Sequence, residues 1–208
     1  MKILIVAATQ FEIEPFLKTN PSAEVLICGV GIPATVHHLT KKLLQDKYDV
    51  VIQAGIAGTF SKKIKKGQVV AVKQDAFGDI GVEENGNFKT IFQSGFGNEN
   101  EYPFTKGWLI NSSEILKANH LKRVKAVSIN KISDRKKQTK QLKKIFNSDI
   151  ESMEGAAFHY VCLQQKIPFL QLRGISNKVG ERDKTKWKLQ DAIESLNNEL
   201  IKIIDSIK

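Results

Sequence analysis

Short, unbroken runs of apolar residues alternate along this chain with segments of helical periodicity, and this alternation limits the fold more than any other feature. The apolar runs are Ile3 to Ala8, Val25 to Cys28, Val50 to Ile52, Val69 to Val72, Val124 to Ile129 and Phe169 to Leu172. Unbroken runs are typical of strands buried on both faces. The helical segments are Pro33 to Gln45, Lys136 to Phe146, Glu154 to Gln165 and Trp187 to Ile207. The pattern predicts an α/β fold with a mixed, mainly parallel central sheet flanked by helices.

The chain length favours one domain over residues 1–208, because 208 residues with 41% apolar content supply one sizeable core. The segment from Gly78 to Gly107 is rich in glycine, asparagine and phenylalanine and is predicted to hold strands and loops. The last helix carries an apolar stripe, formed by Leu189, Ile193, Leu196, Leu200, Ile203 and Ile207. The stripe predicts a helix that docks on the sheet, with a coiled-coil contact as the alternative.

The net charge of +10 comes almost entirely from lysine. Base readout and bidentate phosphate binding favour arginine, and stacking needs aromatic residues, but neither accompanies the lysine pairs. These pairs are Lys62-Lys63, Lys65-Lys66, Lys136-Lys137 and Lys143-Lys144. We therefore expect a solvated surface and no nucleic-acid partner, with a basic, non-catalytic nucleic-acid-binding module as the alternative of a different class.

The cysteines and the opening segment indicate the compartment. Cys28 and Cys162 each lie in or beside an apolar run, which is typical of reduced, buried thiols. The run Ile3 to Ala8 is shorter than a signal-peptide core, and Glu12 and Glu14 follow it at once. The sequence therefore predicts a cytoplasmic protein without a disulfide framework and without membrane contact.

Several polar groups lie at the ends of predicted strands or at the start of a predicted helix. Glu12 comes just after the first apolar run, and Glu154 begins a helix within the segment Glu151 to Phe158. Arg173 and Asn177 lie at the end of the last apolar run. Because open α/β sheets bind ligands at the carboxyl ends of their strands, we expect these side chains to converge there.

These elements, in this order, resemble the purine nucleoside phosphorylase and nucleosidase superfamily over nearly the whole chain. Two segments look like that family's glycine loops, Cys28 to Ala34 and Val51 to Gly58. The segment Glu151 to Ala157, together with Asn177, resembles most closely the futalosine hydrolase family. The resemblance implies a single-domain nucleoside phosphorylase-like fold and an N-ribosyl hydrolase acting on a nucleoside and water. It also implies no cofactor and a homodimer or higher homo-oligomer.

The resemblance implies roles for individual residues. Glu12 would orient and deprotonate the attacking water, and its charge would favour the oxocarbenium-like sugar. Glu154 would bind the ribose hydroxyls against Met153, and Ile132 would offer backbone groups to the purine. Arg173 would pair with a site carboxylate. From the residues alone each also suits a structural role, such as a carboxylate at a helix start or a structural salt bridge.

Asn177, with Ser176 beside it, decides the expected base. An amide can donate hydrogen bonds to O6 and N7 of a 6-oxopurine, where a carboxylate would repel O6. A turn or helix-cap asparagine is the structural alternative. The resemblance to the futalosine hydrolase family implies the reaction, which is the hydrolysis of futalosine to hypoxanthine and dehypoxanthine futalosine in menaquinone biosynthesis.

Two same-fold alternatives remain open. Asn177 speaks against a methylthioadenosine/S-adenosylhomocysteine nucleosidase, because adenine-specific relatives carry aspartate there. A 6-oxopurine nucleoside phosphorylase would look to arginines in its N-terminal half for phosphate, whereas the first arginine of this chain is Arg123.

The remaining predictions concern the 5′ group and cofactors. The carboxyphenyl group of futalosine needs a basic or aromatic pocket, with Phe11, Phe77 and Phe158 as candidates. No metal site is expected, since the histidines form no ligand motif: His37, His38, His120 and His159. Gly29-Val30-Gly31 lacks the third glycine of a dinucleotide fingerprint.

Overall fold

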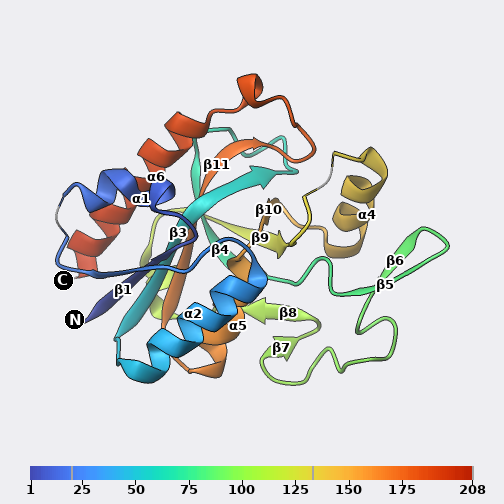
Figure 1. The fold of residues 1–208 in the computed structure, drawn as a ribbon, viewed down its shortest axis with the longest axis horizontal. Coiled ribbons are helices and arrows are strands. Elements are labelled where there is room, and N and C mark those ends of the chain that lie inside the picture. Colours follow the sequence, from blue (N-terminus) through green and yellow to red (C-terminus); the bar gives the residue numbers. More distant parts are fainter. Residues whose placement is uncertain (20, 133, 208) are drawn as a thin grey trace.

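The computed structural model describes residues 1–19, 21–132 and 134–207. The main sheet contains β1 (Ile3–Ala7), β2 (Glu24–Ile27), β3 (Val50–Thr59), β4 (Val69–Asp75), β7 (Phe104–Thr105), β8 (Trp108–Ile110), β9 (Lys122–Ser128), β10 (Ile150–Ser152) and β11 (Phe169–Lys178). The helices are α1 (Gln10–Leu17), α2 (Ile32–Gln45), α3 (Glu114–Ala118), α4 (Lys136–Phe146), α5 (Gly155–Gln164) and α6 (Leu189–Ile207). A separate hairpin is formed by β5 (Gly81–Glu84) and β6 (Asn87–Thr90). The predicted α/β fold is confirmed (Figure 1).

The topology of the main sheet brings distant segments together at one end of β3. The strand order is β2-β1-β3-β10-β9-β4-β8-β7, and β11 pairs with both β3 and β4. The pairings therefore close a circuit of β3, β10, β9, β4 and β11. β1 and β11 run parallel to β3, whereas β10 runs antiparallel to it. As a result, β10 and β11 flank β3 at its carboxyl end.

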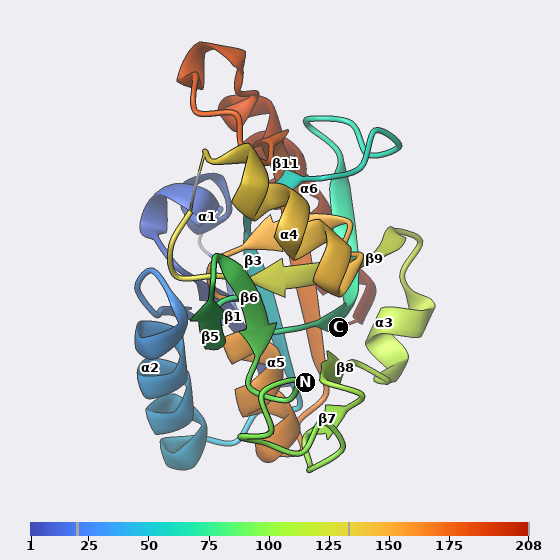
Figure 2. The same ribbon diagram turned by 90° about the vertical axis from the view of Figure 1, so that its right-hand side faces the viewer.

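Helices cover both faces of this sheet (Figures 1 and 2). α1 and α6 pack in one apolar cluster with Ile5 and Ile52, and α2 and α5 pack in another with Leu4 and Val51. Successive strand residues point to opposite faces, so strands covered on both sides are apolar at every position. This burial explains why the opening run is unbroken.

The predictions for the last helix, for the segment from Gly78 to Gly107 and for the two cysteines are confirmed as well. α6 buries its apolar stripe against β11 and β3, so the last helix docks on the sheet. The segment from Gly78 to Gly107 holds β5 to β7 and loops. Cys28 and Cys162 are free and buried. Among the described residues, no helix combines the length and apolarity that crossing a bilayer requires.

One element prediction was wrong. The segment Val51 to Gly58 is not a glycine loop but part of the continuous strand β3. Gly55 is needed there for close packing, because a Cβ atom would overlap Nη1 of Arg173 and lie 3.1 Å from Oε1 of Glu12. The other glycine segment is a loop from Cys28 to Gly31, where Gly31 has a φ of 91°, and its last three residues, Ile32 to Ala34, begin α2.

Candidate functional site

A cavity of about 280 Å³ lies at the carboxyl ends of β1, β3 and β11, beside β10. We call it the strand-end pocket. Its wall includes Phe11, Glu12, Val30, Ile132, Glu151, Met153, Glu154, Ser176 and Asn177. The loop after β11 supplies further wall residues, including Glu181, Arg182 and Trp187. The polar groups predicted to converge at this sheet edge therefore do so, with Arg173 lying behind the wall.

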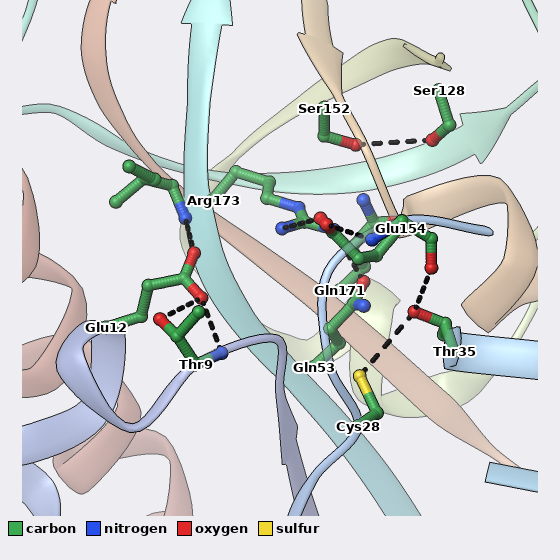
Figure 3. Close-up of polar contacts among 12 residues, drawn as sticks. Thr9, Glu12, Cys28, Thr35, Gln53, Ser128, Ser152, Glu154, Gln171 and Arg173 are labelled. Atoms are coloured by element: carbon green, nitrogen blue, oxygen red, sulfur yellow. Dashed lines mark hydrogen bonds and ion pairs between the residues drawn. The ribbon is translucent and has the colours of Figure 1, made fainter. Parts of the chain in front are cut away.

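Glu12 is held by donors on both carboxylate oxygens (Figure 3). Oε2 accepts hydrogen bonds from the backbone N–H and the hydroxyl of Thr9, both at 3.1 Å. Oε1 accepts from the backbone N–H of Ile56 in β3, at 3.0 Å. Thr9 is the N-cap of α1, so the hydrogen bond that its N–H donates to the Glu12 carboxylate belongs to a capping box. The start of α1 and the end of β3 thus fix this carboxylate at the pocket wall.

The helix that carries Glu12 is kinked, and Asn197 of α6 bridges the kink. Ile13 leaves helical geometry, with φ −123° and ψ 16°, and Pro15 lies within the same helix. The N–H of Phe16 donates to Oδ1 of Asn197 at 3.0 Å, and Nδ2 of Asn197 donates to the carbonyl of Glu12 at 3.0 Å. In a regular helix that N–H and that carbonyl would bond to each other. The buried amide therefore replaces a missing helical hydrogen bond next to Glu12.

This bridge gives a stability prediction. Replacing Asn197 with Leu leaves a buried N–H and a buried carbonyl without partners. Each unpaired group destabilises the folded state by roughly 1–3 kcal/mol. We expect Asn197→Leu to lower the free energy of unfolding, measured by urea denaturation, by about 2–5 kcal/mol. Asn198→Leu, the same change at the next and exposed position of α6, serves as the control. Equal effects of the two substitutions would contradict the bridging role.

Glu154 and Arg173 form a second polar group beside Glu12. Glu154 is the N-cap residue of α5 and accepts a hydrogen bond from the N–H of Gly31 at 3.0 Å. Nη1 of Arg173 lies 3.8 Å from Oε2 of Glu154, and its Nη2 donates to Oε1 of Gln53 at 2.8 Å. Burial raises the pKa of Glu154, and the Arg173 guanidinium opposes that rise. Arg173 is 1% exposed and lies behind Glu154, so it acts on the pocket through that carboxylate.

Asn177 lies at the end of β11, just after a β-bulge between Ile175 and Asn177. The hydroxyl of Ser176 donates to its Oδ1 at 2.8 Å, and its Nδ2 donates to the carbonyl of Lys178 at 2.8 Å. Ser176 is 1% exposed. The buried hydroxyl therefore sets which face of the amide carries the N–H groups. An amide has two N–H groups, so Nδ2 retains one further donor.

Glu151 is a pocket residue to which the sequence analysis gave no role. It is 8% exposed, and burial raises the pKa of its carboxyl to about 7, with the charge of Asp79 adding to the rise. β10 has three residues, so no local pattern marked it as a strand and Glu151 carried no sequence signal. Asn197 was missed as well, although a polar residue on the apolar face of a predicted helix was an available signal.

The three phenylalanine candidates separate clearly. Phe11 lines the pocket and is 53% exposed, at a mouth that also includes the exposed Val30 and Ile132. Phe158 instead lies in the core against Phe169. Phe77 packs against the rings of Phe104 and Tyr160. The structure therefore brings Phe11 to the pocket, and it places Phe77 and Phe158 elsewhere.

Comparisons with known proteins identify the family of this chain. The chain is 24% identical to the futalosine hydrolase of Thermus thermophilus, covering 93% of this chain and 91% of that protein. It is 26% identical to the aminodeoxyfutalosine nucleosidase of Campylobacter jejuni, covering 88% of each. The crystal structure of the 5′-methylthioadenosine/S-adenosylhomocysteine nucleosidase from Helicobacter pylori has the same fold. Its TM-score is 0.82 at 19% identity, covering 99% of this chain and 98% of that one. A model of the phosphorylase superfamily matches residues 20–207, and the chain therefore belongs to that superfamily.

Proposed function

We propose that this protein is a nucleosidase that hydrolyses the N-glycosidic bond of futalosine, releasing hypoxanthine and dehypoxanthine futalosine. The observation that carries the proposal is the meeting of Glu12, Glu154 and Asn177 at one pocket. The relatives named futalosine hydrolase and aminodeoxyfutalosine nucleosidase support a nucleoside of this class as the substrate. Asn177 favours the 6-oxopurine member of that pair.

The pocket supplies the groups that glycosidic cleavage needs. The reaction passes through an oxocarbenium-like sugar, so one face needs a base for water and the departing purine needs hydrogen bonds. Glu12 orients and deprotonates the water, and its negative charge stabilises the cationic sugar. Glu154 accepts hydrogen bonds from the ribose hydroxyls beside Met153. Asn177 donates to O6 or N7 as negative charge develops on the leaving base.

Water is the proposed nucleophile rather than phosphate. Of the four arginines, Arg182 alone lines the strand-end pocket. Arg173 is committed to Glu154 and Gln53. The acidic wall of Glu12, Glu151 and Glu154 would repel a phosphate dianion. Hydrolysis therefore suits the charges of the pocket better than phosphorolysis.

The reaction type is tested by product analysis with purified protein. Futalosine is incubated with and without phosphate, and the released base and sugar products are identified by chromatography. We expect hypoxanthine and dehypoxanthine futalosine at the same rate in both buffers. A phosphate requirement with formation of a sugar 1-phosphate would contradict the proposal, and so would a failure to cleave any nucleoside.

The cellular setting is also part of the proposal. We place the enzyme in menaquinone biosynthesis, in the cytoplasm, as a homodimer. The exposed Phe11, Val30 and Ile132 form an apolar mouth that a second subunit would cover, and Phe11 then packs against the 5′ carboxyphenyl group. Light scattering at micromolar concentration checks the dimer, and a monomeric mass would contradict it.

Asn177 gives a specificity prediction. A carboxylate at this position accepts from the 6-amino group of adenine and repels O6 of hypoxanthine. We expect Asn177→Asp to lower the ratio of kcat/KM for futalosine to kcat/KM for aminodeoxyfutalosine by about 100-fold. The control is Asn198→Asp, which makes the same change on the exposed face of α6. An unchanged ratio in the Asn177 variant would show that another group selects the base.

A further inference from the structure

Glu151 and Asn177 are held on opposite sides of one glycine. Glu151 in β10 pairs with Gly58 of β3, and Asn177 in β11 pairs with the same glycine from the other side. Side chains of paired residues project to the same face of a sheet. Both side chains therefore enter the strand-end pocket from one face, and both line it. Two strand spacings separate their backbones by about 10 Å.

Gly58 leaves the floor between these two side chains open. A Cβ atom there would lie 3.1 Å from Cγ2 of Val179 and 3.4 Å from Nδ2 of Asn177. Because Gly58 has no Cβ atom, a planar ligand group can lie over its backbone. Glu151 would then face one edge of that group and Asn177 another. The geometry suits a planar, fused-ring base lying between the carboxyl and the amide.

The carboxyl of Glu151 is largely shielded from water, since only 8% of the residue is exposed. It also makes no hydrogen bond to any other described residue. Its neighbours in the pocket differ in this respect, since Glu12 accepts three hydrogen bonds and Glu154 accepts one. Buried polar groups without partners are costly. Such a group at a pocket wall is placed to pair with a donor on the ligand.

We propose that Glu151 reads the base by accepting the N1–H of a 6-oxopurine through its carboxylate, while Asn177 binds the O6 and N7 edge. This inference rests on the proposed nucleosidase function and adds a second specificity residue to it. Hypoxanthine carries a hydrogen at N1, whereas N1 of adenine is an acceptor. An adenine base would place its N1 lone pair against the Glu151 carboxylate. Glu151 in β10 and Asn177 in β11 would therefore both disfavour adenine.

The test compares two nucleosides that differ at the 6 position, futalosine and aminodeoxyfutalosine, at about pH 8, above the Glu151 pKa of about 7. Glutamine keeps the side-chain size but can donate to N1 of adenine as well as accept from N1–H. Glu151→Gln should therefore lower the kcat/KM ratio of futalosine to aminodeoxyfutalosine by about 10–100-fold. Glu194→Gln, on the exposed face of α6, should leave the ratio unchanged.

A second measurement changes the ligand and leaves the protein intact. Hypoxanthine and 1-methylhypoxanthine are compared as competitive inhibitors of the unsubstituted enzyme, since the methyl group removes the N1–H. We expect the methylated base to bind about 10–100-fold more weakly. Equal inhibition, or equal losses on both nucleosides in Glu151→Gln, would overturn the role of Glu151 alone. An enzyme that cleaves neither nucleoside would overturn the proposed function as well.

Discussion

Glu12→Gln is expected to lower kcat for futalosine hydrolysis by about a thousandfold. The substitution keeps the size of the side chain, and its amide oxygen can still accept from the N–H of Thr9. It removes the negative charge that takes the water proton and stabilises the sugar cation. Because these interactions develop in the transition state, kcat should fall much more than KM changes. Steady-state kinetics of hypoxanthine release measure both.

Glu14→Gln is the matched control, since Glu14 lies in the same helix and is exposed. We expect near-normal kinetics from it. A Glu12→Gln enzyme that keeps more than about a tenth of the activity would contradict the role of Glu12 as the base. Its carboxylate would then serve the capping box and the bond to Ile56 only.

Arg173→Met is expected to lower the free energy of unfolding by about 3–5 kcal/mol, the usual effect of removing one partner of a buried ion pair. The substitution leaves Glu154, which is 5% exposed, without the nearby positive charge, and it removes the donor to Oε1 of Gln53. Urea denaturation measures the loss. Arg123→Met provides the control, because Arg123 is exposed on β9.

The loss should depend on pH. Burial already raises the pKa of Glu154 in the folded protein, and without Arg173 that pKa rises further. A carboxyl with a raised folded-state pKa favours folding when protonated, and this advantage is lost as pH rises above the unfolded value. Glu154 is protonated differently in the two folded proteins only above its raised wild-type pKa, so the difference in unfolding free energy between wild type and Arg173→Met should be constant at low pH and grow as pH rises above that pKa. A loss that is constant over this range would mean that packing, not charge, explains the effect.

The fold was predictable where burial leaves a repeating pattern. Leu4 and Ile5 are fully buried on opposite faces of β1, so an apolar run identified the strand without tertiary information. β10 has three residues, and its pairing with β3 and β9 is non-local, so no local sequence pattern predicts this strand. Glycine is required at position 55 because the Arg173 side chain, from much later in the chain, packs against it, and local glycine content cannot reveal this contact.

The candidate site was predictable to the same extent. Glu12 and Asn177 follow predicted strands, and Glu154 stands at the start of a predicted helix. The three residues meet because those strands end, and that helix begins, at the strand-end pocket. Which aromatic ring reaches the pocket depends on side-chain direction, so Phe11 could not be separated from Phe158 beforehand. The position of Glu151 at the pocket depends on strand register, and the role of Asn197 depends on the kink in α1. Neither feature can be predicted from the local sequence.

The central claim is that the strand-end pocket is built for the hypoxanthine base of futalosine. Its most direct test is the ratio of kcat/KM for futalosine to that for aminodeoxyfutalosine, which differs at the 6 position of the base, measured with one enzyme preparation in phosphate-free buffer. The account predicts a ratio above about 1,000, since an adenine base mismatches both Asn177 and Glu151. A ratio below one would contradict the account and identify an adenine nucleosidase.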